Sequence, residues 1–293
     1  MAAGLGRVKA LLELTKVRLS FLVAFSSAFG YLLGTSQFNL SVLSLLFLGG
    51  FLVSGASITI NQILEREYDK LMKRTAMRPL PTQRITVTEA KIFAGSIGLV
   101  GFTLLIVSTN TLTVLLSAIS LLVYSFVYTP LKRVGPIAVL AGAIPGALPP
   151  LIGWVAATGS IDVGALVIFA LQFMWQFPHF WAIAWVADED YRKAGFKLLP
   201  SGGGKNINTA FQIMIYTLCL IPLGILPAKF GITGINSALF VTIAGAFFFG
   251  QTFFLMKQCV LGKTDTRKAA LSIMLGSFLY LPIVQISFLL DKL

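Results

Sequence analysis

Long apolar segments recur along this chain, and they limit it to one class of fold. A helix that crosses the hydrocarbon core of a bilayer needs about 20 mostly apolar residues. The 293-residue sequence offers that length repeatedly, with 56% hydrophobic and only 12% charged residues. We predict an all-α polytopic membrane protein with nine transmembrane helices around a central cavity. The predicted helices cover residues 19–36, 41–62, 90–108, 112–130, 137–157, 163–187, 208–227, 235–256 and 269–290.

The basic residues are unevenly distributed between the predicted loops. All but two of the 23 Lys and Arg residues lie before the first helix or close to the loops that follow even-numbered helices, the exceptions being Lys229 and Lys292. Cytoplasmic loops of membrane proteins are enriched in Lys and Arg. We therefore expect the N-terminus in the cytoplasm and the C-terminus on the opposite side. This distribution also argues against nucleic acid as the reason for the net charge of +12.

Acidic residues are scarce, and six of the 11 gather in two clusters. The first cluster, at positions 65, 67 and 69, follows the second predicted helix, and the other, at 188–190, follows the sixth. Both clusters therefore lie on the predicted cytoplasmic side, four helices apart. We interpret this spacing as a weak internal duplication of two halves, roughly 1–135 and 136–293, within a single transmembrane domain over residues 1–293.

The first acidic cluster has the spacing of one helix face. Asn61, Glu65 and Asp69 are four residues apart, so each step turns only about 40° around the helix and all three share a stripe. Glu67 points about 160° away from Glu65 and is left out of the predicted site. Two carboxylates and an amide oxygen are hard ligands of the kind that bind Mg²⁺ together with substrate phosphates. The alternative is a solvated helix end held by ion pairs four residues apart.

Basic residues accompany the acids, directly after the first cluster and at the end of the fourth helix. Arg binds phosphate oxygens in pairs, and Lys supplies a point charge. Taken singly, each of these residues is better explained as a topology determinant or a contact to anionic lipid. Acids and bases together at the mouth of an apolar bundle predict instead a Mg²⁺–diphosphate site whose substrate tail lies in the membrane. The candidate diphosphate ligands are Lys73, Arg74, Arg78, Lys132 and Arg133.

Four segments resemble one family, in that family's order along the chain. Residues 61–81 read NQILEREYDKLMKRTAMRPLP, which resembles the N-x-x-x-E-x-x-x-D…M-x-R-T…R-P-L-P signature of the protohaem IX farnesyltransferases, the haem branch of the UbiA-type intramembrane prenyltransferases. The other segments are LTKVRLSFLVAFSSAFGYLLG, YSFVYTPLKRVGPIAVLAGAIPGALPPLIGW and WQFPHFWAIAWVADEDYRKAGFKLLP. Many relatives in the wider superfamily carry D-x-x-x-D in the second acidic cluster, where this chain has Ala187 and Tyr191. Which of residues 188–190 would bind metal is therefore open.

The resemblance implies a substrate pair and a cofactor. The donor would be farnesyl diphosphate, the acceptor haem B, the product haem O and the cofactor Mg²⁺. The resemblance assigns the metal to Glu65 and Asp69 with Asp188 or Asp190, and the orientation of the diphosphate to Asn61. Ionisation would give a farnesyl cation, a haem vinyl group would attack it, and water would capture the resulting carbocation. Delivery of the product to haem A synthase or terminal oxidase assembly is a further expectation.

Two other functions compete with this interpretation. One is a related prenyltransferase that acts on an aromatic quinone precursor such as 4-hydroxybenzoate. The other is a transporter or channel, but transporters place their site near the bilayer midplane on broken helices. Here both acidic clusters lie at one membrane face, which favours an enzyme. The short N-terminal segment favours the bacterial cytoplasmic membrane over the mitochondrial inner membrane, with the active site toward the cytoplasm.

Aromatic and imidazole side chains inside the predicted helices are further candidates. Tyr124 and Tyr128, one helical turn apart, could offer their ring faces to the farnesyl cation, or could belong to an interfacial aromatic belt. The single histidine, His179, lies deep in the sixth helix on a polar stripe with Gln172 and Gln176. Imidazole is an ordinary axial ligand of haem iron, so we hypothesise that His179 contacts the haem. The alternative is a core histidine satisfied by glutamine and backbone.

The fifth predicted helix is rich in proline. Pro145, Pro149 and Pro150 lie inside it, together with Gly142 and Gly146. Proline removes backbone donors and kinks helices, while glycines four residues apart permit close helix contact. We expect this helix to form a bent wall of the cavity, with packing alone as the alternative.

Overall fold

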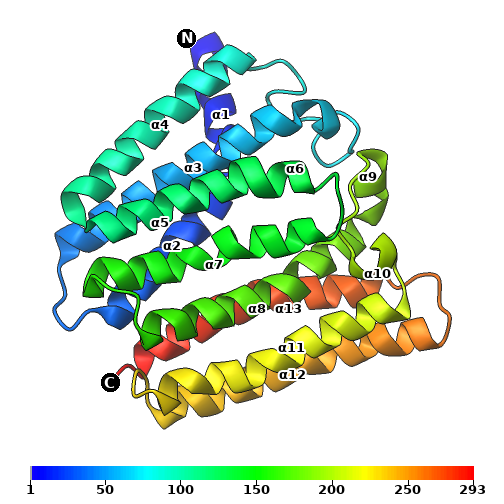
Figure 1. The fold of residues 1–293 in the computed structure, drawn as a ribbon. Coiled ribbons are helices and arrows are strands. Elements are labelled where there is room, and N and C mark those ends of the chain that lie inside the picture. Colours follow the sequence, from blue (N-terminus) through cyan, green and yellow to red (C-terminus); the bar gives the residue numbers. More distant parts are fainter. Residues whose placement is uncertain (1) are drawn as a thin grey trace.

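The computed structural model describes residues 2–293, and nine helices within that range are long and apolar enough to cross a membrane. The predicted all-α fold is therefore confirmed (Figure 1). The spanning helices are α2 (Val17–Gly34), α3 (Leu40–Asp69), α4 (Val87–Ser108), a continuous segment of α5 (Thr111–Leu122), η1 (Val123–Tyr128) and α6 (Thr129–Leu131), α7 (Ile137–Thr158), α8 (Val163–Val186), α11 (Ile207–Lys229), α12 (Ile235–Val260) and α13 (Arg267–Leu290). Three short helices are α1 (Ala2–Leu14), α9 (Asp188–Lys193) and α10 (Pro200–Gly203).

Several observed helix ends differ from the predicted ones, and at the start of α4 a polar cap sets the difference. The first turn of a helix leaves backbone N–H groups without partners, and a side-chain oxygen just before the helix satisfies them. Thr86 and Glu89 form such a capping box, so α4 begins at Val87 and not at residue 90. At the other extreme, α3 continues well beyond the predicted end at residue 62, as far as Asp69. The whole Asn61–Glu65–Asp69 stripe is therefore helical.

Helix α7 lies inside the bundle and contacts α2, α5 and α8. Its contact with α2 depends on two glycines at which no side chain fits. A Cβ on Gly30 would lie 1.9 Å from the backbone oxygen of Pro150, and one on Gly153 would lie 1.8 Å from that of Ser27. The two backbones therefore pack directly against each other, as small residues allow within a membrane.

The outer surface carries large apolar side chains. Leu99 on α4 and Ile243 and Phe247 on α12 are each about 70% exposed. Large apolar side chains are exposed in the same way along most of the spanning helices. Because lipid tails solvate such side chains, this surface matches the hydrocarbon core of a bilayer.

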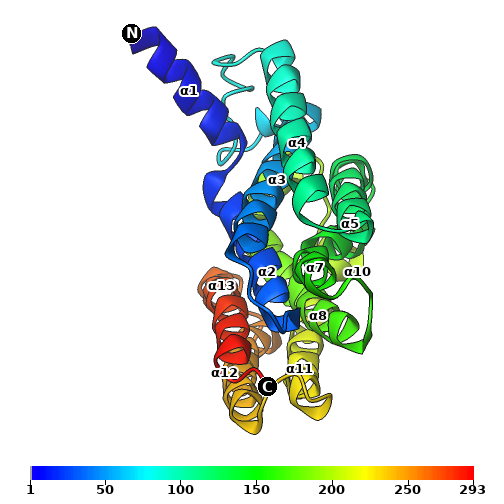
Figure 2. The same cartoon turned by 90° about the vertical axis from the view of Figure 1, so that its left-hand side faces the viewer.

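The functional loops gather at one end of the bundle. Figure 1 shows the loops after α3 and α6, together with α9 and α10, at the same end, and the C-terminus at the opposite end. Figure 2 shows α1 extending away from the bundle on the side of α3 and α4. Helix α1 is an addition to the predicted elements, because its segment is too short and too polar to count as a span. The orientation of this end toward the cytoplasm stays a prediction.

Candidate active site

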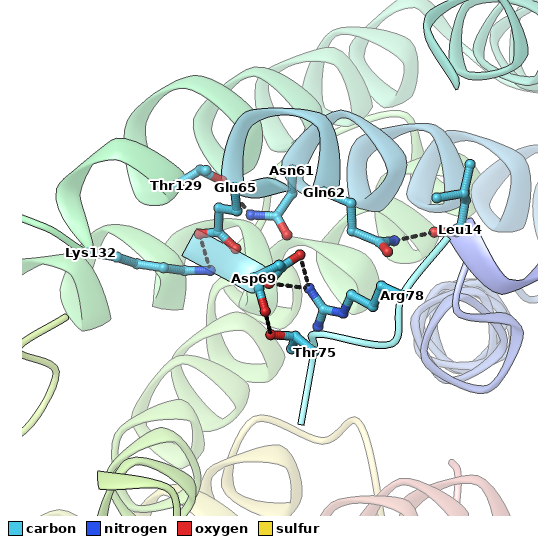
Figure 3. Close-up of polar contacts among 9 residues, drawn as sticks. All are labelled: Leu14, Asn61, Gln62, Glu65, Asp69, Thr75, Arg78, Thr129 and Lys132. Atoms are coloured by element: carbon cyan, nitrogen blue, oxygen red, sulfur yellow. Dashed lines mark hydrogen bonds and ion pairs between the residues drawn. The ribbon is translucent and has the colours of Figure 1, made fainter. Parts of the chain in front are cut away.

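One polar stripe runs along the inner end of α3. Ser57, Asn61, Glu65 and Asp69 follow one another at four-residue intervals and are all buried. Figure 3 shows Asn61, Glu65 and Asp69 projecting from the same side of the helix. Full burial of a carboxylate is costly without a charged partner. Each buried carboxylate of the stripe is therefore expected to have a basic residue beside it.

Asp69 is paired with Arg78. The Nη1 atom of Arg78 donates to both carboxylate oxygens of Asp69, at 2.9 and 2.7 Å, while Asp69 is completely buried. The hydroxyl of Thr75 donates to the backbone oxygen of Asp69 at 2.9 Å. These contacts fold the loop after α3 back over the end of its own helix, and the helical spacing alone did not reveal them (Figure 3).

Glu65 is paired with Lys132, which follows α6. The Lys132 ammonium lies 2.8 Å from Oε1 of Glu65, and both groups are buried. Burial alone would lower the pKa of Lys132, but the Glu65 carboxylate overcomes that effect and raises it above its ordinary value. Lys132 is therefore charged at neutral pH. The amide of Asn61 donates to Oγ1 of Thr129 at 2.8 Å, so both contacts tie α3 to α6.

The second acidic cluster meets the first loop through the backbone. Asp190 accepts hydrogen bonds from the backbone N–H groups of Lys73 and Arg74, at 3.3 and 3.2 Å. Asp188 is buried and lies 3.1 Å from Arg192 and 3.7 Å from Lys205. The predicted meeting of the two acidic loops therefore occurs at this end of the bundle.

The structure does not assemble the predicted four-carboxylate metal set. Within residues 2–293, no three His, Cys, Asp or Glu side chains lie close enough together to hold one metal ion. Asp190 uses its oxygens on backbone amides, and Asp188 is held by bases of its own loop. Glu65 and Asp69, with the amide oxygen of Asn61, keep the hard-oxygen character that suits Mg²⁺. The metal role of all four acids stays a prediction.

The remaining predicted bases lie around these pairs. Arg133 donates to the hydroxyl of Tyr68 at 2.7 Å and lies over its ring. Arg74 lies 5.8 Å from the ring centroid of Tyr191. Lys73 and Arg74 are exposed. None of these three bases forms an ion pair with an acid among the described residues, so their charge is available to an anion.

Lys16 is a basic residue of the site that sequence reasoning counted only as a topology signal. It is half-buried in the turn between α1 and α2, where its backbone takes a left-handed conformation (φ 45°). Burial and the charges of Arg78, Lys132 and Arg74 lower its pKa to about 7, and only Asp69 opposes them. The surplus of positive charge indicates that this part of the site is built for an anion.

A cavity of about 340 Å³ continues inward from the stripe. Ser57 lines it one helical turn before Asn61, and its walls come from α2, α3, η1, α7, α8 and α13. Its surface is mostly apolar, as expected for a small-molecule site. The acid–base pairs therefore lie at the mouth of a chamber within the membrane region.

Tyr124 and Tyr128 line this cavity. They lie on η1, one turn of π-helix, a rare element that often marks functional sites. Their ring centroids are 5.3 Å apart, and Lys132 Nζ lies 4.5 Å from the Tyr128 centroid. The rings thus lie between the basic cluster and the cavity, and not in an aromatic belt facing lipid. Proline at position 130 gave the only signal of a local break in this helix.

His179 also lines the cavity, and its ring is held on several sides. It stacks on Trp175 at 4.3 Å, and Nδ1 lies 2.9 Å from Oγ of Ser277. The Ser277 hydroxyl donates to the Met274 backbone oxygen, so it accepts its hydrogen bond from Nδ1 of His179. Nε2 then carries the lone pair and has no partner among the described residues. This is the tautomer that a metal ligand requires.

The prolines of α7 account for two other cavity contacts. Pro150 cannot donate to the backbone oxygen of Gly146, its normal helical acceptor. Gln172 and Gln176 donate to that oxygen instead, at 2.8 and 2.9 Å. Gly142 and Gly146 serve close side-chain contacts, since a Cβ on either would lie under 3 Å from Tyr128 or Gln176. Helix α7 is therefore a cavity wall, as predicted.

Sequence comparison places this arrangement in a known class. Residues 23–281 match the UbiA prenyltransferase family, and the chain belongs to that family. Within it, the chain is 54% identical over 286 residues to the protein named "Protoheme IX farnesyltransferase" from Cytophaga hutchinsonii, covering 97% of this chain and 98% of that one. The protein of the same name from Flavobacterium psychrophilum is 43% identical over 288 residues, covering 96% and 93%. The chain is thus a prenyltransferase with close bacterial relatives.

Solved structures share the fold. A structure of digeranylgeranylglyceryl phosphate synthase aligns with a TM-score of 0.75 at 22% identity, covering 97% of this chain and 98% of that one. A UbiA homolog from Archaeoglobus fulgidus bound to DMAPP and Mg²⁺ aligns with a TM-score of 0.69 at 18% identity, covering 93% and 99%. At these identities the likeness establishes the architecture alone.

Proposed function

We propose that this chain transfers the farnesyl group of farnesyl diphosphate to a vinyl group of haem B, with addition of water, to give haem O. The proposal rests on one observation: acid–base pairs, an apolar cavity and a histidine follow one another from the mouth inward. Buried acid–base pairs at the mouth lead into an apolar cavity, and that cavity contains a histidine with a free Nε2. The names of the bacterial relatives support the same substrates.

The diphosphate end of the reaction belongs to the mouth of the cavity. Lys16, Arg78 and Lys132 neutralise the charge that grows on the leaving group as the C–O bond breaks. Glu65 and Asp69, with the Asn61 amide, would hold Mg²⁺, which supplies Lewis-acid polarisation of phosphate oxygens when bound. Their pairing with Lys132 and Arg78 orients the carboxylates before substrate arrives.

The farnesyl chain belongs in the apolar cavity. When the diphosphate leaves with the bonding electrons, a cation remains at C1 of the farnesyl group. Tyr124 and Tyr128 offer ring faces next to the mouth, and aromatic faces attract cations. The apolar walls keep bulk water away from the cation until the acceptor attacks.

The haem end belongs to His179. A neutral imidazole with a free Nε2 is an axial ligand for iron, and stacking on Trp175 with the hydrogen bond to Ser277 fixes its direction. An aromatic quinone precursor would have no use for such a ligand, so this residue favours haem over 4-hydroxybenzoate. A bacterial cytoplasmic membrane, with the loop end toward the cytoplasm and later transfer of product to haem A synthase or oxidase assembly, completes the proposal.

One assay tests the proposal. Membranes containing the protein receive farnesyl diphosphate, Mg²⁺ and either haem B or 4-hydroxybenzoate, and pyrophosphate and prenylated products are followed. Hydroxyfarnesylated haem is the expected product.

Glu65→Gln and Asp69→Asn should lower kcat by about 100-fold or more without loss of membrane insertion. Glu67→Gln is the matched control, because Glu67 is exposed and pairs only with Lys70 and Arg66. Prenylated benzoate without haem O would support the quinone-precursor alternative, and no turnover with either acceptor would reopen transport.

A further inference from the structure

Three glutamines interrupt the apolar lining of the cavity. Gln172 and Gln176 come from α8 and Gln285 from α13, and each is 5% exposed or less. An amide in a membrane interior is costly unless its polar atoms are hydrogen-bonded. The hydrogen bonds of these amides therefore show which polar atoms are left for a ligand.

Most of these amide atoms bond to one another, to Ser26 or to the backbone of the proline-rich helix α7. Gln285 Nε2 donates to Ser26 Oγ at 3.0 Å and to Gln172 Oε1 at 2.9 Å. Gln172 and Gln176 both donate to the backbone oxygen of Gly146. Gln176 Oε1 is left without a hydrogen-bond partner in residues 2–293, and its second N–H is also free.

The free amide lines the same cavity as the tyrosine rings and the imidazole. On α7, Gly142 packs under the Tyr128 ring and Gly146 packs under the Gln176 amide. These two glycines are one helical turn apart, a rise of about 6 Å. His179 follows Gln176 by three residues on the same helix and lines the same cavity. Because α7 starts at the loop end of the bundle and α8 returns to it, Gln176 lies about one helical turn deeper in the cavity than His179 and the Tyr128 ring.

We propose that Gln176, held by the Gly146 backbone oxygen and the Gln172–Gln285–Ser26 network, binds the water molecule that is added to the prenylated haem. This inference rests on the proposed function. A buried water needs two to four polar partners, and the Gln176 amide offers both an acceptor and a donor within the cavity lining. The farnesyl cation must be shielded from bulk water, but the product contains a hydroxyl group that comes from water. A single water molecule bound at Gln176 meets both requirements.

The chemical step balances with this water alone. The vinyl group attacks C1 of the farnesyl cation with its π electrons, which forms a carbon–carbon bond and leaves a carbocation on the vinyl carbon attached to the porphyrin. The water oxygen donates an electron pair to that carbon, and the resulting oxonium ion loses a proton to solvent. Without a positioned water, the carbocation loses a proton from the neighbouring carbon, and the product is an alkene lighter by one water.

The test measures which product forms. Purified wild-type protein and the variant Gln176→Leu are given farnesyl diphosphate, Mg²⁺ and haem B in oxygen-18 water, and mass spectrometry gives the fraction of prenylated haem that carries the labelled hydroxyl. We expect the ratio of hydroxylated to dehydrated product to fall about tenfold in Gln176→Leu. Gln251→Leu is the control, since Gln251 is a part-buried glutamine on α12 outside the cavity lining.

The outcomes separate this inference from the proposed function. No pyrophosphate and no prenylated haem from the wild type would end the proposed function. An unchanged product ratio in Gln176→Leu, with labelled hydroxyl still present, would overturn the water site alone. Because the readout is a ratio, a slow variant still answers the question. If Gln176→Leu does not fold, Gln285→Leu decides, since it breaks the network and leaves the Gly146 oxygen satisfied; an unchanged ratio there also overturns the inference.

Discussion

Asp190 accepts hydrogen bonds from the backbone N–H groups of Lys73 and Arg74, and so fastens the loop after α3 to the loop after α8. The two loops come from helices far apart in the sequence. The Asp190 carboxylate accepts one backbone amide on each oxygen, and this holds the backbone from which the Lys73 and Arg74 side chains extend. Asp190, from the second acidic cluster, thus holds the loop after α3 in place at the site.

Loss of the two hydrogen bonds that Asp190 accepts should weaken diphosphate binding. In Asp190→Ala the backbone amides of Lys73 and Arg74 turn to solvent, and the loop loses its attachment. We expect the KM for farnesyl diphosphate to rise about tenfold, equivalent to about one hydrogen bond to a charged group, with a smaller change in kcat. Steady-state kinetics checks this. Glu189→Ala is the control, because Glu189 is exposed, and a kcat loss as large as that of Asp69→Asn would indicate instead that Asp190 binds metal.

The Asp69–Arg78 pair predicts a measurable coupling in stability. Arg78→Ala leaves a fully buried carboxylate without its partner, which costs about 3–5 kcal/mol. Asp69→Asn leaves the less buried arginine free to reach water, so its cost should be smaller. Thermal unfolding in detergent of both single variants and the double variant gives the coupling free energy. Additive effects would contradict a direct interaction.

Lys16 predicts a pH dependence. Its pKa of about 7 means that the ammonium is charged below that pH and neutral above it, with Arg74, Arg78, Lys132 and Asp69 as the charges that face it. Diphosphate binds the charged form, so the KM for farnesyl diphosphate should rise as pH increases from about 6 to 8. Lys16→Arg should remove most of that rise, because guanidinium stays charged.

Kinetics of the two proteins at matched pH values provides the check for Lys16. Ionisation of the substrate affects both proteins equally and cancels in the comparison. Equal slopes in wild type and Lys16→Arg would exclude Lys16 as the titrating group.

Ser277 should control haem binding through His179. Ser277→Ala removes the acceptor of the Nδ1 hydrogen bond, so the ring is free to turn or to change tautomer. Loss of such a partner of a metal-ligating histidine typically costs about 10–100-fold in affinity. Titration with haem, followed by its absorption band, measures this. Ser277→Thr is the control, because it keeps a hydroxyl and should retain the wild-type spectrum. If His179→Ala changes neither the haem spectrum nor the haem affinity, His179 is not a haem ligand.

The sequence by itself determined the spans and the carboxylate stripe. Burial of an apolar helix in a bilayer depends only on the length and composition of that segment, so each span could be located independently of the others. The stripe of Asn61, Glu65 and Asp69 follows from the period of a single helix. The internal duplication and the cytoplasmic orientation rest on the same local counts and stay predictions.

Only the tertiary structure decided the partners of these residues. Glu65 meets Lys132 across two helices, Asp190 holds the backbone of a distant loop, and Gln176 reaches a carbonyl that Pro150 leaves free on α7. Lys16 joins the site because the turn between α1 and α2 brings it beside Arg78. Each of these contacts depends on how separate helices pack, and packing is set by the shape of many side chains at once. No local pattern along the chain carries that information.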